Sequence, residues 1–198
     1  MERTYKPLAS HAMPAQTSYR QPVLPPSRHV DLDDAAADVM TDFRSVRAIT
    51  VPATVSMDYA SERMRANRVH LLLVTDERNT IVGLITSTDI EGERPLVHMR
   101  QFAMRRQELS VADIMTPSER IEVIEMADVV RARVGHVVAT LKAVGRQHAM
   151  VVDRDDAGRS IVRGLFAVSQ LNRQLGEPFD PTEIARSFAD VEMALAYH

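Results

Sequence analysis

The chain has 198 residues, 45% of them hydrophobic, so most of it should fold as one or two small globular domains. A net charge of only −3, and the lack of any apolar run of about eighteen residues, argue against both nucleic acid and a membrane as partners. The absence of cysteine excludes disulfides, thiolate chemistry and Cys-based metal sites; it suits a reducing compartment, so we expect a cytoplasmic protein.

Residues 1–30 form the first segment, which is rich in proline, serine, glutamine and alanine. Its prolines are Pro7, Pro14, Pro22, Pro25 and Pro26. Such a composition cannot bury enough apolar surface to offset the entropy of ordering. We predict a flexible Pro-rich arm.

Residues 31–95 contain a regular alternation of elements. DVMT (38–41) is followed by the strand-like SVRAITV (45–51) and by a helix capped at Thr54 or Ser56. The apolar runs HLLLVTD (70–76) and IVGLIT (81–86) read as strands joined by a polar turn. A short helix should begin near STDI (87–90). Met57, Ala60 and Met64 share one face of the first helix, and we expect them in the core.

Residues 96–110 are predicted to be a linker helix, after which residues 111–176 repeat the same order of elements. DIMTP (113–117), IEVIE (121–125), HAMVVD (148–153) and IVRGLF (161–166) correspond to the segments of the first half. One long helix behind Asp128 is expected to bury a stripe made of Val130, Val134, Val137, Val138, Leu141 and Val144.

Residues 177–198 are predicted to form a C-terminal helix, with Asp180 as its cap and Pro181 in its first turn. Its apolar stripe is Ile184, Phe188, Val191 and Leu195. The whole pattern predicts an α/β fold of two pseudo-twofold-related repeats, each β-α-β-β-α, plus a linker helix and a C-terminal helix. Aligning the two halves at Met40 and Met115 places His70 and His148 at equivalent positions.

The two copies differ at one turn. GLITSTDI (83–90) carries Thr86, Thr88 and Asp89, whereas GLFAVSQL (164–171) lacks the hydroxyl at the first of these positions and the carboxylate at the last. A carboxylate such as Asp89 can accept hydrogen bonds from the two adjacent hydroxyls of a ribose. The same residues also suit a helix N-cap, and the two roles do not exclude each other.

With the entrances DVMT and DIMTP, the strand ends VTD and VVD, and the Gly-apolar-apolar-Thr-x-x-Asp run at 83–89, the chain resembles a tandem CBS (cystathionine-β-synthase-type) domain pair, or Bateman module. The resemblance covers residues 37–175. It implies a regulator that binds an adenosine-containing ligand (AMP, ADP, ATP or S-adenosylmethionine) between the repeats, requires no cofactor for catalysis, and forms a homodimer.

The resemblance also implies which residues would hold the ligand. The first repeat would contribute Thr86, Ser87, Thr88 and Asp89, and the second would contribute Thr116, Ile121, Arg146, Gln147, His148, Ala149 and Met150. Met150 departs from the family, which usually has proline there. Because the second copy has Gln170 instead of an aspartate, we expect one competent site and one that is lost or altered.

The sequence disfavours two other functions. Neither His70 nor His148 has a second histidine or carboxylate at ligand spacing, so we predict no metal site. The sequence contains no P-loop, nucleophile-elbow, zinc-protease or dinucleotide-binding motif, so we expect no enzyme. The alternative to a ligand-sensing regulator of a partner protein is a ligand-free scaffold that only dimerises.

Overall fold

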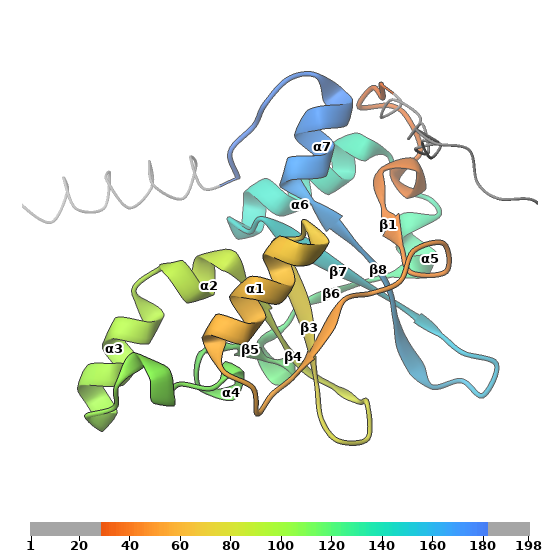
Figure 1. The fold of residues 1–198 in the computed structure, drawn as a ribbon. Coiled ribbons are helices and arrows are strands. Elements are labelled where there is room, and N and C mark those ends of the chain that lie inside the picture. Colours follow the sequence, from red (N-terminus) through yellow and green to blue (C-terminus); the bar gives the residue numbers. More distant parts are fainter. Residues whose placement is uncertain (1–28, 182–198) are drawn as a thin grey trace, which may run out of the picture.

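The computed structural model describes residues 29–181, which form two sheets flanked by helices (Figure 1). The first sheet has the strand order β2-β3-β4-β5, and the second has the order β1-β8-β7-β6. The first half follows the predicted β-α-β-β-α order, and the second follows it with two helices, α5 and α6, in place of the first helix. The predicted α/β fold of two repeats is confirmed.

The first repeat is built as its sequence pattern indicates. It consists of β2 (Thr50–Pro52), α1 (Met57–Asn67), β3 (Leu71–Thr75), β4 (Ile81–Thr86) and α2 (Ser87–Glu91). Ser56, not Thr54, caps α1: its hydroxyl accepts a hydrogen bond from the Tyr59 backbone N–H at 3.2 Å. Met57, Ala60 and Met64 are buried as predicted.

The second repeat differs from the prediction in its helix. It consists of β6 (Val123–Glu125), α5 (Met126–Val129), α6 (Val134–Val144), β7 (His148–Arg154), β8 (Ser160–Ala167) and α7 (Val168–Leu175). The single long helix is wrong, because extended backbone at Arg133 separates α5 from α6. Val130 falls in the break and is exposed, and Val144 is exposed at the end of α6. Val134, Val137 and Leu141 are buried as predicted.

The linker is also shorter than predicted. Instead of one helix over 96–110, α3 spans Arg94–Phe102, and Ala103 takes a left-handed conformation with φ 52° that ends it. A 3₁₀ turn at Arg106–Glu108 (η2) and the short helix α4 (Val111–Ile114) follow. A second 3₁₀ turn, η1 (Ala36–Val39), lies near the start of the first repeat, at the position that α4 occupies in the second. A third, η3 (Ser118–Arg120), precedes β6.

The entrance segment of each repeat pairs with the sheet of the other. Strand β1 (Thr41–Asp42), near the start of the first repeat, pairs with β8, and β5 (Thr116–Pro117), near the start of the second repeat, pairs with β4. The repeated glycines make this close approach possible. A Cβ on Gly83 would lie 2.6 Å from the Thr116 carbonyl oxygen, and one on Gly164 would collide in the same way with the carbonyl oxygen of Thr41.

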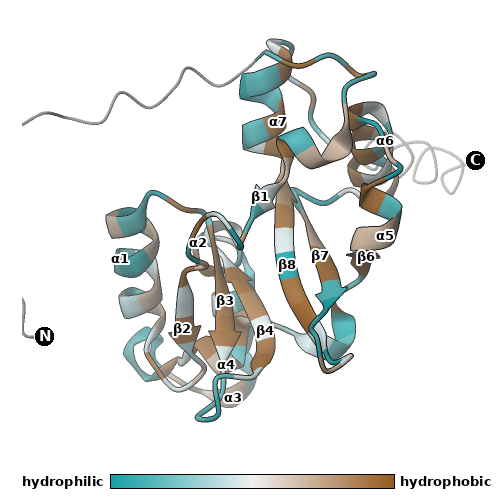
Figure 2. Ribbon diagram, turned by 90° about the vertical axis from the view of Figure 1, so that its right-hand side faces the viewer, coloured by the Kyte–Doolittle hydropathy of each residue, from teal (hydrophilic) through white to brown (hydrophobic). Residues whose placement is uncertain are grey.

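Each half has its own apolar core, and the inner faces of the sheets pack on each other (Figure 2). The cluster between the halves centres on Leu71 and Leu73 of β3 and Met150 of β7. Because the entrances are exchanged, Val111 and Ile114 of α4 lie in the first core, while Val39 lies in the second. This apolar contact sets the position of the cleft described below.

The ends of the described region bear on two predicted segments. Most of the predicted arm and of the predicted C-terminal helix lies outside residues 29–181, and the described residues 177–181 are not helical. Val30, placed in the arm by the sequence, is buried in the core of the second half. Within residues 29–181 no helix is both long and apolar enough to cross a membrane.

Candidate functional site: a cleft between the repeats

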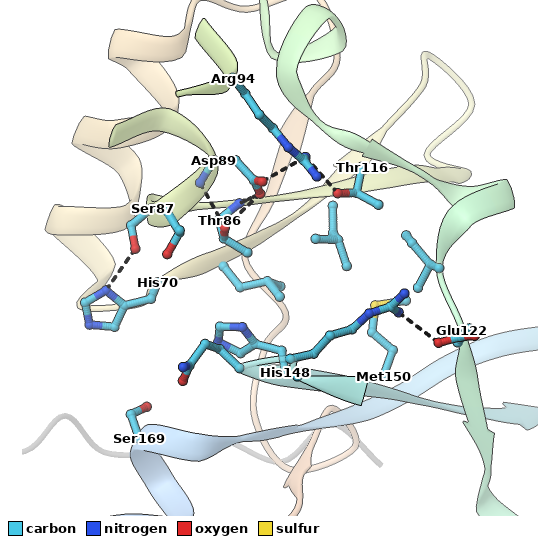
Figure 3. Close-up of a pocket in the computed structure, with 17 residues that line it drawn as sticks. His70, Thr86, Ser87, Asp89, Arg94, Thr116, Glu122, His148, Met150 and Ser169 are labelled. Atoms are coloured by element: carbon cyan, nitrogen blue, oxygen red, sulfur yellow. Dashed lines mark hydrogen bonds and ion pairs between the residues drawn. The ribbon is translucent and has the colours of Figure 1, made fainter. Parts of the chain in front are cut away.

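A cavity of about 530 Å³ opens between the two sheets, beside α2 (Figure 3). Ten of the eleven predicted site residues line it: Thr86, Ser87, Thr88, Asp89, Thr116, Ile121, Arg146, Gln147, His148 and Met150. Ala149 does not line it, because neighbouring strand residues point to opposite faces, and Ala149 packs into the core of the second half. The structure therefore brings residues from both repeats to one cavity.

Asp89 is the third residue of α2, and its carboxylate completes a capping box with Thr86. Its Oδ2 accepts hydrogen bonds from the Thr86 backbone N–H at 2.9 Å and from the Thr86 hydroxyl at 2.7 Å. The Asp89 backbone N–H in turn donates to the Thr86 hydroxyl at 3.2 Å. The capping role weighed from sequence is therefore present, and it uses one carboxylate oxygen.

The other oxygen of Asp89 faces Arg94, the first residue of α3. Arg94 Nη1 lies 2.8 Å from Asp89 Oδ1 and donates to the Thr116 hydroxyl at 3.1 Å and to the Ile114 carbonyl at 3.3 Å. The Asp89 side chain is 13% exposed and that of Arg94 is 54% exposed. Arg94 thus joins the first repeat to the entrance of the second across the edge of the cavity.

His148 begins strand β7 on the side of the cavity opposite Arg94 (Figure 3). Burial lowers the pKa of His148 from its ordinary 6.5 to about 4, and the charge of nearby His70 acts in the same direction, while Asp89 opposes them. His70 itself lies 3.4 Å from the Ser87 hydroxyl through its Nδ1. At neutral pH the His148 ring is therefore uncharged and able to donate one hydrogen bond and accept another.

Strand register corrects the sequence alignment of the two histidines. Leu71 pairs with Thr86 in the first sheet, and His148 pairs with Ala167 in the second. His148 is therefore equivalent to Leu71, not to His70. The side chains of Leu71 and His148 line the same cavity, one from each repeat.

The remaining wall carries a second ion pair. Arg146 Nη1 lies 3.3 Å from Glu122 Oε2, and both residues line the cavity. The floor is apolar and includes Leu71, Leu84, Ile121 and Met150. An apolar floor with a few polar groups at its rim is typical of small-molecule sites, and the volume falls within their usual range of about 300–1,000 Å³.

Several lining residues were missed by the sequence reasoning: His70, Leu71, Leu84, Arg94, Glu122, Gly145 and Ser169. Arg94 is the important omission. Its position shortly after Asp89, at the start of the next helix, was the available signal, but its partner Thr116 is distant in sequence and reaches it only through the exchanged entrance. Among residues 29–181, no group of three histidines, cysteines or carboxylates is placed to hold a metal ion.

The equivalent position in the second repeat has different contacts. Gln170, third residue of α7, accepts a hydrogen bond from the Thr41 hydroxyl at 2.8 Å through Oε1 and donates to the Val39 carbonyl at 3.3 Å through Nε2. Thr41 is the counterpart of Thr116, since the two pair with Leu165 and Leu84 respectively. On this side the amide bridges directly to the entrance.

Comparison with known proteins agrees with this architecture. No curated protein matches the sequence significantly, whereas the family model of the CBS domain matches residues 36–93. The fold is similar to that of an uncharacterized conserved protein from Pyrococcus horikoshii, at 19% identity and a TM-score of 0.52 over 76% of this chain and 98% of that one.

Two further solved structures are similar. One is CBSX2, solved in complex with AMP, at 21% identity and a TM-score of 0.50 over 71% of this chain and 94% of that one. The other is the CBS domain of a bacterial CNNM/CorC family Mg²⁺ transporter, solved with an inhibitor, at 18% identity and a TM-score of 0.50 over 75% and 81% of the two chains. Residues 36–93 thus match the family model of the CBS domain, and the second repeat has the same order of strands around the same cleft.

Proposed function

We propose that the chain is a regulatory module that binds an adenosine-containing ligand in the cleft beside Asp89. The observation that carries this proposal is the placement of Asp89 at the edge of a 530 Å³ cavity lined by both repeats. A ligand there would touch both sheets at once, so its binding energy depends on their relative position. This is the physical basis for converting binding into a change of shape.

The hydrogen-bonding capacity of Asp89 supports a sugar hydroxyl as the group recognised. Oδ2 already accepts two hydrogen bonds, whereas Oδ1 contacts Arg94 and retains a further lone pair. A ribose hydroxyl is a neutral donor and can use that lone pair without removing the counter-charge. The apolar floor, including Met150, suits the flat face of a purine.

One solved structure with a similar fold holds an adenosine compound. CBSX2 was solved with AMP, and the match to it covers most of both chains. At 21% identity this likeness carries the fold alone. We therefore rest the choice of adenosine on Asp89 and the cavity, and we propose a regulatory rather than a catalytic role because the family model is that of a CBS domain.

A thermal-shift series with AMP, ADP, ATP, S-adenosylmethionine and adenosine tests the proposal. A ligand that binds only the native state increases the free energy of unfolding, by about 2.7 kcal/mol at a hundredfold excess over its dissociation constant. The melting temperature rises as a result. GTP serves as the matched control for charge. No shift with any adenosine compound at millimolar concentration would contradict the proposal and leave the ligand-free scaffold as the better hypothesis.

Dimerisation through the helices, the cytoplasmic location and the regulation of a partner protein stay predictions. On the described surface, α3 carries three exposed apolar side chains, Leu96, Val97 and Phe102. Sedimentation at micromolar concentration, with and without the best ligand, distinguishes a monomer from a dimer.

A further inference from the structure

The guanidinium of Arg94 is held in place by one of its nitrogens. Nη1 makes all of its contacts, to Asp89, to the Thr116 hydroxyl and to the Ile114 carbonyl. Within residues 29–181, Nε and Nη2 of Arg94 make no hydrogen bond or ion pair. Arg94 therefore combines a fixed position with an edge of unused N–H donors, the edge that binds a phosphate or carboxylate in a bidentate manner.

The charges around the cavity are balanced in two pairs. Arg94 is paired with Asp89, and Arg146 is paired with Glu122. The Arg146–Glu122 pair lies at the exposed rim, where an ion pair contributes little and is readily exchanged for another anion. Both guanidinium groups line the cavity, Arg94 from α3 and Arg146 from the segment before β7, so an added phosphate has two cations within the same cavity.

The hydroxyl and carboxylate groups beside Arg94 give the cavity no preference for a positively charged ligand. The Thr86 hydroxyl is committed to Asp89 by its capping box, and Asp89 is already neutralised by Arg94. S-adenosylmethionine offers a carboxylate to the same edge, but it would also bring two cations, its sulfonium and its ammonium group, next to Arg94 and Arg146. An uncharged nucleoside would leave the free edge of Arg94 unused.

We propose that Arg94 is the specificity-determining residue of the cleft, and that its free edge selects a nucleoside carrying a 5′-phosphate over uncharged adenosine and over S-adenosylmethionine. This inference rests on the proposed function and goes beyond it by naming the chemical class of ligand. Arg94 contacts the phosphate directly in this proposal. Its hold on Asp89 is a second, positioning role that the experiment must separate from the first.

The test measures dissociation constants of AMP, adenosine and S-adenosylmethionine by calorimetry for the wild type, Arg94→Gln and Arg100→Gln. Arg100 is the matched control, because it is exposed on the same helix and does not line the cavity. The wild type should bind AMP about ten- to a hundredfold more tightly than adenosine, the gain expected from charge-assisted hydrogen bonds.

Arg94→Gln should remove most of this preference by weakening AMP alone, while adenosine affinity stays within about twofold of wild type. Arg100→Gln should leave all three affinities unchanged. The AMP affinity of the wild type should also fall with salt more steeply than that of Arg94→Gln. Thermal unfolding of each variant without ligand verifies that it is folded.

Other outcomes overturn the inference in recognisable ways. If Arg94→Gln weakens adenosine and AMP equally, Arg94 only positions Asp89, and the proposed function stands without phosphate selection. If S-adenosylmethionine binds more tightly than AMP, the selection by charge is wrong. If the wild type binds none of the three compounds, this inference fails, and the proposed function fails with it only when ADP and ATP give no thermal shift either.

Discussion

On the side of the first repeat, Asp89 reaches the entrance residue Thr116 only through Arg94, whereas on the side of the second repeat Gln170 hydrogen-bonds the equivalent Thr41 directly. Both residues occupy the third position of their helix. The carboxylate of Asp89 is paired with the guanidinium of Arg94, which keeps N–H donors that are not hydrogen-bonded to any described residue. A neutral amide is satisfied by its two neighbours and recruits nothing.

The halves also differ in how the exchanged entrance is attached. In the second sheet, Arg163 binds Asp42 of β1 at 2.7 and 3.0 Å and Asp153 of β7 at 3.2 Å. Val82 and Pro117, the equivalents of Arg163 and Asp42 in the first sheet, carry no charge. In the second sheet, ion pairs of Arg163 therefore hold β1, and the Gln170 amide hydrogen-bonds Thr41. On the first side, the ion pair is that of Arg94 and Asp89, and it lies in the cleft. Exchanging residues between equivalent positions tests which of these differences matter.

The largest effect is expected from Arg163→Val, which gives the second half the residue of the first. Hydrogen bonds from Arg163 hold the pKa of Asp42 below its ordinary value, so Asp42 is ionised at neutral pH and loses its partner in the variant. Because the Arg163 side chain is only 10% exposed and Asp42 is 27% exposed, we expect a loss of about 3 kcal/mol in the free energy of unfolding. Urea denaturation measures it.

Arg159→Val is the matched control for this change. Arg159 also pairs with an aspartate, Asp155, but its side chain is 79% exposed, so its loss should cost less than about 1 kcal/mol. Equal losses for the two variants would show that attachment of the entrance contributes nothing special to stability.

The next effect is a pH dependence of the free energy of unfolding that comes from His148. It is tested by His148→Leu, which gives the second half the leucine found at the equivalent position 71 of the first half. The folded pKa of His148, about 4, lies below its ordinary 6.5, so the unfolded chain binds a proton more readily between these values. Unfolding free energy should therefore fall as pH decreases from 6.5 to 4, by about 2–3 kcal/mol from this residue.

Carboxylates titrate near the lower end of the same range, so the informative quantity is the difference between wild type and His148→Leu. Urea denaturation at several pH values should give a shallower slope for the variant between pH 6.5 and 4. Parallel curves would mean that His148 is protonated in the folded cleft at little cost.

A smaller effect, on binding rather than stability, is expected from Asp89→Gln, which gives the first half the residue of the second. Losing hydrogen bonds to a charged acceptor should cost about 1.5–3 kcal/mol of binding, or roughly one to two orders of magnitude in affinity for the best adenosine ligand. Gln170→Ala should leave this affinity nearly unchanged. Calorimetry on both variants decides between the sites.

Stability must be measured in parallel for this pair, because Asp89 also completes the capping box of α2, and losing such a cap costs about 1 kcal/mol. A variant that loses affinity without losing stability supports ligand contact. Loss of binding in Gln170→Ala with Asp89→Gln unaffected would assign the competent site to the other half.

Much of the fold was predictable because local patterns and the repeat agree. The apolar runs of β3 and β7, the stripe of Met57, Ala60 and Met64, and the cap at Ser56 are properties of short segments, which periodicity and capping chemistry describe well. The break between α5 and α6 was not predictable in this way. The valines continue the helical spacing across it, while extended backbone at Arg133, whose guanidinium donates to the Asp33 carbonyl, interrupts the helix.

The sequence by itself determined that two repeats exist, that one of them has lost its aspartate, and which residues are chemically able to recognise a ribose. Only the tertiary structure decided that the entrances exchange sheets, and that Arg94 therefore reaches Thr116. It alone aligned His148 with Leu71. Pairing between distant strands sets these relations, and a shift of one residue in a strand turns its side chain to the opposite face.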